Sequence, residues 1–278
     1  MSEYPQQFGT PTAAAGAAAA MGGVSRAAEF LRVAPADPAL LVWSDEFEYT
    51  GPPDPSKWTY DVGGHGWGNG ELQCYTDRSE NAWVADGKLC IKARREAFGG
   101  MEFTSARLVT KGRADWLYGR VEVRLKLPTA RGAWAAAWML PTDSSFGQWP
   151  RSGEIDIMEH VGHDVGNVHG TVHTDRFNHL KNTQVGKIMP VAVADWHTYA
   201  VEWSPDKICF MCDDLQYHEF PKCPGGGWDA WPFDRHFHIL LNVAVGGAWG
   251  GQQGVDKDVF GGEGQIMEVA WVRVYRLG

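Results

Sequence analysis

Short runs in which apolar and polar residues alternate, separated by Gly, Pro, Asn and Asp, constrain the fold of this chain more than any other feature. The clearest runs are 89–93, 119–125, 196–203, 236–244 and 267–275. Alternation with a period of two is typical of β-strands, and it places Val121 and Val123 in a core with Glu122 and Arg124 facing outward. Because these runs recur with almost no helical periodicity between them, the sequence predicts an all-β sandwich of two sheets.

The first 38 residues differ in composition from the rest of the chain. They hold an Ala-rich stretch from Ala13 to Ala20, with Gly and Pro nearby and few large apolar residues. Such a segment has too little apolar surface to build a core, so residues 1–38 are predicted to be a low-complexity, disordered N-terminal segment. Because Glu3 precedes any basic residue, no clear signal peptide is expected. Residues 39–278 are then predicted to form a single domain, a length common for β-sandwiches.

Charge and hydropathy limit the partners of the chain. The net charge is −9 and the sequence pI is about 5.5, which argues against nucleic acid and anionic membranes. No segment reaches the roughly 18 uninterrupted apolar residues of a membrane span. A neutral polysaccharide is compatible with this charge. The 14 tryptophans suit such a partner, because the apolar face of a sugar ring packs on an indole, although core packing explains a single Trp equally well.

One segment, residues 149–160, sets three carboxylates among apolar residues. Strand alternation directs Glu154 and Asp156 to one face while the isoleucines between them enter the core. Glu159 lies five residues beyond Glu154, so regular alternation would turn it to the opposite face. A β-bulge near Ile157 and Met158 would bring it back beside the other two. Carboxylates on a half-buried strand are costly, and this cost is typical of groups used for metal binding or acid/base chemistry.

The spacing of the outer glutamates indicates which chemistry. A retaining glycosidase needs a nucleophile and an acid/base whose carboxyl groups lie about 5–5.5 Å apart, against about 6.5–9.5 Å in an inverting enzyme. Glu154 and Glu159 on one face of a bulged strand suit the shorter separation. Asp156 between them would adjust their protonation, because clustered carboxylates cannot all ionise together. The alternative is three acids on a solvated strand face.

The segment resembles the E-x-D-x-x-E signature of glycoside hydrolase family sixteen, in its laminarinase-like branch. Other stretches resemble the same branch in the same order: 43–47, 69–76, 105–110, 132–141, 169–174, 241–249 and 271–275. The resemblance covers roughly residues 40–278. It implies a jelly roll of two curved antiparallel sheets with an open substrate cleft on the concave face.

The resemblance also assigns roles to single residues. It makes Glu154 the nucleophile, Glu159 the general acid/base and Asp156 the residue that tunes them. Eight further residues would contact the sugar: Asn69, Arg107, Trp134, Trp138, Trp149, His173, Asn242 and Trp249. The alternatives are core packing for the tryptophans, an ion pair with a surface carboxylate for Arg107 and a structural role for His173.

A metal and a cofactor are not expected. Many bacterial members of the family hold a structural calcium ion partly through an aspartate in the last strand, and here that position is Ala270. Calcium needs six to eight oxygen ligands, so the loss of this carboxylate argues against the site. His169 and His173 share a strand face, but no third ligand is evident in the sequence.

The resemblance implies an endo-acting, retaining β-glucanase that cuts β-1,3 linkages in laminarin-like or cell-wall glucans without a cofactor. A monomer in an extracellular or secreted location is expected from this substrate class. Two alternatives remain open. The fold also serves as a non-catalytic glucan-binding recognition protein, although such proteins typically lack the glutamates. Same-fold hydrolases act on mixed-linkage glucan, agar or carrageenan; Met158, the extra residue of the longer signature, argues against the mixed-linkage enzymes but not against the others.

Overall fold

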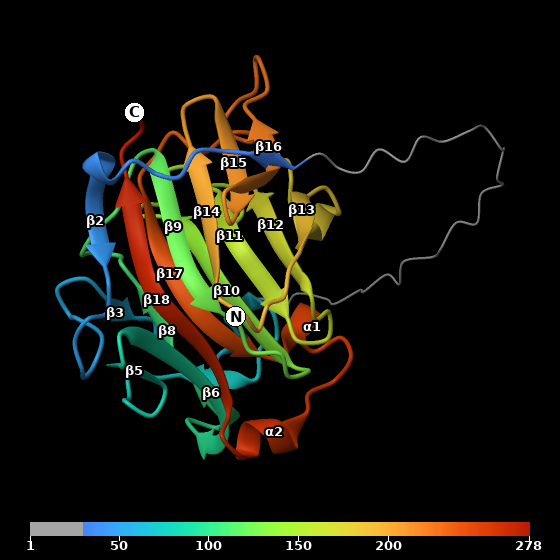
Figure 1. The fold of residues 1–278 in the computed structure, drawn as a ribbon. Coiled ribbons are helices and arrows are strands. Elements are labelled where there is room, and N and C mark those ends of the chain that lie inside the picture. The colour runs from blue at the N-terminus through green and yellow to red at the C-terminus, as the bar shows by residue number, and fades with distance from the viewer. Residues whose placement is uncertain (1–29) are drawn as a thin grey trace, which may run out of the picture.

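Two β-sheets pack face to face in the described part of the chain (Figure 1). The structure is a computed structural model, and it describes residues 30–278. The eleven-stranded sheet holds β1 (Leu31–Arg32), β2 (Leu41–Asp45), β4 (Gln73–Tyr75), β5 (Ala82–Ala85), β6 (Lys88–Phe98), β7 (Met101–Ser105), β9 (Gly119–Lys126), β14 (His197–Trp203), β15 (Lys207–Cys212), β16 (Leu215–Pro221) and β18 (Gln265–Tyr275). The seven-stranded sheet has the order β13 (Val185–Pro190), β12 (Asn167–His173), β11 (Glu154–Val161), β10 (Ala133–Pro141), β17 (Phe237–Val245), β8 (Arg107–Val109) and β3 (Thr59–Tyr60). The predicted all-β, two-sheet sandwich is confirmed.

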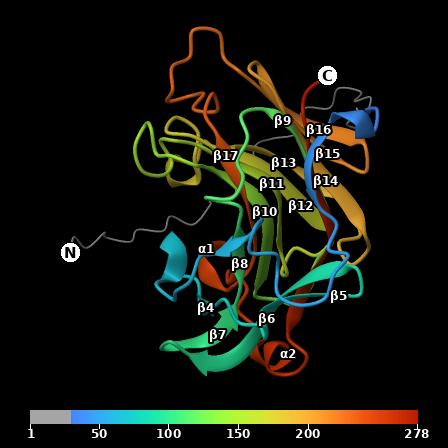
Figure 2. The same cartoon turned by 90° about the vertical axis from the view of Figure 1, so that its left-hand side faces the viewer.

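Helices are short and peripheral in the described part of the chain. They are α1 (Gly247–Gly250), α2 (Lys257–Gly261) and the 3-10 turns Pro38–Leu40, Gly66–Gly68 and His179–Lys181. Figures 1 and 2 both place α2 at one end of the sandwich, beside β6. No helix within residues 30–278 has the length and apolarity needed to cross a bilayer.

The core lies between the two sheets and follows the alternation read from the sequence. Val121 and Val123 of β9 are fully buried in it, as predicted. Glu122 faces the other way, yet it is also buried, and Arg120 offsets the cost by donating a 2.7 Å hydrogen bond from Nε to its carboxylate. Within residues 30–278, one strand pair departs from the antiparallel pattern: β4 runs parallel to β7.

The N-terminal boundary of the domain differs from the predicted one. Residues 1–29 of the predicted disordered segment lie outside the described residues. Residues 30–38, assigned to the same segment, pack on the sandwich: Leu31 and Arg32 pair with β16, and the amide of Val33 donates to the carbonyl of Asp214 at 2.9 Å. The domain therefore begins no later than residue 31. Leu31 and Arg32 show no strand pattern in the sequence, but they form a strand by pairing with the edge strand β16.

Truncation at two points tests this boundary. Deleting residues 1–29 is expected to leave the melting temperature and activity unchanged, whereas deleting residues 1–38 removes β1 and its hydrogen bonds. The loss should cost on the order of 1–2 kcal/mol, which lowers the melting temperature by roughly 2–4 °C per kcal/mol. Differential scanning calorimetry of the two truncated proteins measures the difference. Equal melting temperatures would show that β1 contributes nothing.

Candidate active site

A β-bulge in β11 brings the three carboxylates to one face. Across the sheet, Ala137 of β10 pairs with Met158 and Trp138 pairs with Asp156, which leaves Ile157 as the extra residue. The pairing of β11 with β12 shifts between Asp156 and Glu159. Ile157 and Met158 are fully buried in the core. The predicted bulge is thus confirmed, and Glu159 shares the outer face of the seven-stranded sheet with Glu154 and Asp156.

An indole N–H donates to each outer glutamate. Trp149 Nε1 lies 2.9 Å from Glu154 Oε2, and Trp134 Nε1 lies 3.1 Å from Glu159 Oε1. Hydrogen bonds to a carboxylate are stronger when the carboxylate is charged, so both contacts favour the ionised form. They also fix the direction in which each carboxyl group points.

His173 lies between the carboxylates of Glu154 and Asp156. It lies opposite Glu154 in the register of β11 and β12. Its Nε2 is 3.3 Å from Asp156 Oδ2 and 3.8 Å from Glu154 Oε1. Ligand atoms of the three residues lie within 4.8 Å of one another, close enough for the charge of each to affect the ionisation of the others. This arrangement places the predicted His173 beside the carboxylates.

Burial shifts the acidity of all three carboxyl groups. Desolvation, and after it the charge of Asp156, raises the pKa of Glu154 to about 8. Desolvation raises the pKa of Glu159 to about 7, and desolvation followed by the charge of Glu159 raises the pKa of Asp156 well above its ordinary value. Because ionisation of one carboxyl opposes ionisation of the next, the group loses its protons stepwise and retains a proton up to neutral pH.

Arg107 lies in a sandwich of two indoles. Its guanidinium carbon is 4.9 Å from the ring centroid of Trp67 and 4.7 Å from that of Trp138. Its Nε is 3.0 Å from Asp61 Oδ2, so the ion pair considered as an alternative is present. The side chain is nevertheless only 12 % exposed, and its charge acts on the buried Glu71, whose ionised form it favours.

Asn69 and Asn242, the two remaining polar residues predicted to contact sugar, belong to one hydrogen-bonded network. Trp138 Nε1 donates to Asn242 Oδ1 at 2.7 Å, and Asn242 Nδ2 donates to the Tyr75 hydroxyl at 3.0 Å. Asn69 Nδ2 donates to Glu71 Oε1 at 3.1 Å. The sequence prediction missed Glu71 and Tyr75, although both lie in the stretch 69–76 that carries the family resemblance.

Trp249 lies on the short helix α1. Its ring packs edge-on against Trp134, with centroids 5.6 Å apart, and against His169, with centroids 4.9 Å apart. Trp249 is therefore in the same cluster as Trp134 and Glu159. His169, which was not predicted to contact sugar, also packs against this tryptophan.

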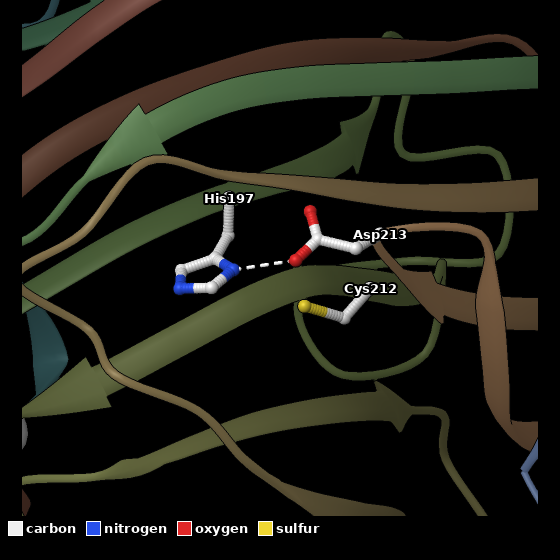
Figure 3. Close-up of side chains that lie close together, drawn as sticks. All are labelled: His197, Cys212 and Asp213. Atoms are coloured by element: carbon white, nitrogen blue, oxygen red, sulfur yellow. Dashed lines mark hydrogen bonds and ion pairs between the residues drawn. The ribbon is translucent and has the colours of Figure 1, made fainter.

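Besides Glu154, Asp156 and His173, a second group of side chains has spacing that could suit a metal ion: His197, Cys212 and Asp213. Figure 3 shows the imidazole of His197 turned toward Asp213, with Nδ1 2.5 Å from Oδ2, and the thiol of Cys212 beside them. The other imidazole nitrogen lies 3.2 Å from the carbonyl of Ala192. Burial raises the pKa of Cys212 to about 12, and only a thiolate binds metal well. These contacts fit a link between the start of β14 and the turn after β15 better than a metal site.

The position at which many family members bind calcium lacks suitable side chains in this chain. Ala270 is the extra residue of a bulge in β18 and offers no side-chain oxygen. The carboxylate of Glu46 is committed to Arg273, whose Nε and Nη2 donate to its two oxygens at 3.0 and 2.8 Å. A calcium shell there would have to come from other oxygens.

We therefore expect the melting temperature to be insensitive to chelators. An ion that binds only the folded protein raises its stability by mass action, so removal of bound calcium would lower the melting temperature. Thermal unfolding in excess EDTA and then in millimolar calcium measures the effect. A reversible shift of several degrees would contradict the expectation.

Comparison with known proteins identifies the family. The family model described as "Glycosyl hydrolases family 16" matches residues 69–272. A "Beta-glucanase" of Rhodothermus marinus is 56% identical over 245 residues, with 85% of each chain covered. A "Glucan endo-1,3-beta-glucosidase" of Cryptopygus antarcticus is 42% identical, and the match covers 78% of this chain and 84% of the relative. The crystal structure of the laminarinase from Rhodothermus marinus superposes with a TM-score of 0.82, over 85% of this chain and 96% of that one. A non-specific endo-beta-1,3(4)-glucanase of the same family superposes with a TM-score of 0.82 at 43% identity, over 90% of this chain and 96% of that one. The family predicted from the sequence is confirmed: the chain belongs to glycosyl hydrolase family 16.

Proposed function

We propose that the chain is an endo-acting, retaining β-glucanase that hydrolyses β-1,3-glucosidic linkages of laminarin-like or cell-wall glucans. The observation that carries the proposal is the bulge at Ile157, which sets Glu154, Asp156 and Glu159 on one face. The similarity to laminarinases and endo-1,3-glucosidases supports the linkage. Indole rings around the carboxylates supply the apolar surfaces on which sugar rings pack.

In the first step, Glu154 attacks the anomeric carbon and Glu159 protonates the departing glycosidic oxygen. The carbon–oxygen bond to the leaving sugar breaks as the bond to Glu154 forms, which yields a covalent glycosyl-enzyme. In the second step, Glu159, now ionised, takes a proton from water, and the hydroxide oxygen replaces Glu154 at the anomeric carbon. Two inversions give net retention, and no cofactor takes part.

Hydrogen bonds and burial affect the protonation of the two glutamates in opposite directions. Glu154 must be ionised to attack, and the N–H of Trp149 together with the nearby His173 stabilises that anion. Burial raises the pKa of Glu154 to about 8 and that of Glu159 to about 7, so either carboxyl group can hold a proton near neutral pH, and the assignment of Glu159 as the acid rests on its place in the family signature. The charge of Glu159 raises the pKa of Asp156, and the charge of Asp156 raises the pKa of Glu154, so ionisation of one carboxyl group changes the proton affinity of the next as the reaction proceeds.

Substrate size suggests where the protein works. A β-glucan polymer does not enter cells, so we propose an extracellular location and action as a monomer on the polymer. The net charge of −9 suits a neutral polysaccharide and gives no attraction to nucleic acid or anionic membranes.

A panel of polysaccharides tests the proposal. Laminarin, curdlan, mixed-linkage glucan, agarose and carrageenan are each incubated with the enzyme, and reducing ends, product linkages and the anomer first released are determined. We expect laminarin to be cut internally, with β-configured reducing ends released before mutarotation. Binding of laminarin without any release of reducing ends would instead support the glucan-recognition function, and cleavage of agarose or carrageenan alone would reassign the substrate.

A further inference from the structure

A fourth buried carboxylate, Glu71, lies beside the site and has no role in the proposed reaction. Its residue is 7% exposed. Three donors converge on it: Asn69 Nδ2 at 3.1 Å, Gln73 Nε2 at 2.6 Å and the Tyr75 hydroxyl at 3.3 Å. Desolvation raises the pKa of Glu71, while these hydrogen bonds and the charge of Arg107 favour its ionised form.

An ionised carboxylate only accepts hydrogen bonds, and this sets the direction of every bond that leads to it. Tyr75 must donate its proton to Glu71, so its oxygen is left to accept from Asn242 Nδ2. The amide of Asn242 therefore turns its oxygen outward, where it accepts the indole N–H of Trp138. A single buried anion thus orders a chain of three side chains that ends at a predicted sugar platform.

The same logic holds for Asn69. Its Nδ2 is committed to Glu71, so its Oδ1 remains as the outward group, and that oxygen accepts no hydrogen bond from the protein within residues 30–278. An exposed amide oxygen accepts from a sugar hydroxyl. If the carboxylate were replaced by an amide, three donors would compete for one acceptor, and Asn69 could turn its NH₂ group outward instead.

Backbone geometry joins this network to the catalytic carboxylates. Glu71 forms an isolated bridge with Gly246. The next residue, Gly247, has φ 76°, and a Cβ built on it would lie 3.2 Å from Glu71 Cγ and 3.4 Å from Trp134 Cζ3. Glu71 and Trp134, the donor to Glu159, therefore flank the same glycine.

We propose that Glu71 is a positioning residue that fixes the direction of the hydrogen bonds on this face, so that Asn69 presents an acceptor to a sugar hydroxyl and Trp138 is held in place for stacking. The inference rests on the proposed glucanase function. It makes Glu71 a determinant of glucan affinity, although the sugar contacts only the residues that Glu71 orients.

The key variant is Glu71→Gln, which keeps size and removes the charge. On laminarin it should raise KM and lower kcat/KM by roughly 10- to 100-fold, because buried donors lose their acceptor, while kcat changes little. In the Glu154→Ala background, which does not turn over, calorimetry with a laminari-oligosaccharide should show a matching loss of affinity. Unchanged affinity and unchanged KM would overturn the inference.

A swapped variant controls for buried charge. Glu71→Gln combined with Gln73→Glu keeps one carboxylate and one amide in the same place, and Glu at 73 can still accept from the amide of Val245, as Gln73 does at 2.7 Å. If the charge served only folding, the swapped protein would bind glucan like the wild type. We expect it to stay impaired, because the acceptor for Asn69 and Tyr75 has moved.

A double-mutant cycle shows whether Glu71 acts through Asn69. Asn69→Ala should weaken binding about tenfold in the wild type and markedly less in Glu71→Gln, because the amide is already misdirected there. Equal losses in both backgrounds would contradict the inference. Should Glu71→Gln fail to fold, Tyr75→Phe removes one link and keeps the charge, and unaltered glucan binding by that variant would also count against the inference.

The two proposals fail in different ways. A wild type that binds laminarin but releases no reducing ends would refute the glucanase function, while calorimetry of the same variants would still test the role of Glu71. A wild type that cleaves laminarin, with a Glu71→Gln variant equal to it, would refute the positioning role alone.

Discussion

Replacing Glu154 by alanine is expected to abolish laminarin hydrolysis, with a loss of turnover on the order of 10⁴- to 10⁶-fold, the scale seen when a catalytic nucleophile is removed. The structure gives Glu154 a fixed direction through the N–H of Trp149, and no other carboxylate on this face occupies the same place. Removal leaves a cavity that a small anion can enter. Added azide should therefore restore cleavage of an activated glucoside, with formation of an α-glycosyl azide.

The azide product is the deciding measurement, because its inverted configuration shows attack from the side of the lost carboxylate. NMR of the product distinguishes the anomers. Glu202→Ala, an exposed position on β14 of the other sheet, is the matched control and should retain full activity. Near-wild-type activity of Glu154→Ala without azide, or a β-configured azide, would contradict the assignment of the nucleophile.

Replacing Glu159 by alanine should have a different effect that depends on the leaving group. Loss of general acid catalysis is expected to slow cleavage of laminarin on the order of 10²- to 10⁴-fold. An aryl glucoside with a good leaving group needs little protonation, so its first step should proceed near the wild-type rate, after which the glycosyl-enzyme accumulates because no base activates water.

Rapid-mixing kinetics with such an aryl substrate should show a burst of released phenol followed by a slow steady state. Azide should accelerate the second step and give a β-configured product, opposite to that of the Glu154 variant. If the two variants behaved alike on activated substrates, the separate roles of the glutamates would be wrong.

The bulge was predictable because it follows from a local rule. Side chains of a strand alternate, so the five-residue separation of Glu154 and Glu159 requires one extra residue if both are to serve one site. The structure places that residue at Ile157. Strand alternation likewise predicted the buried face of β9. The fold class could thus be read from periodicity and from the turn residues between runs.

Features that depend on distant partners could not be read in this way. Glu71 looks like an ordinary polar residue in 69–76, and the network around it is completed by distant residues: Gly246 bridges to it, and Asn242 of β17 bonds to its partner Tyr75 across 167 positions of sequence. The strand at Leu31 and Arg32 exists only because β16 offers an open edge. Local periodicity carries no information about either partner, so the missed residue and the misplaced boundary share one cause.

The indoles that surround the carboxylates also give the protein an optical reporter of its own. Trp149 is 38% exposed beside Glu154, and Trp134 and Trp138 are half-buried on the same face, whereas Trp58 and Trp203 are buried in the core. A sugar ring that covers the first group displaces water from their excited-state environment and leaves the second group untouched. Glucan binding should therefore shift the intrinsic emission to shorter wavelength and shield part of it from iodide, so occupancy of the site can be followed in unlabelled protein.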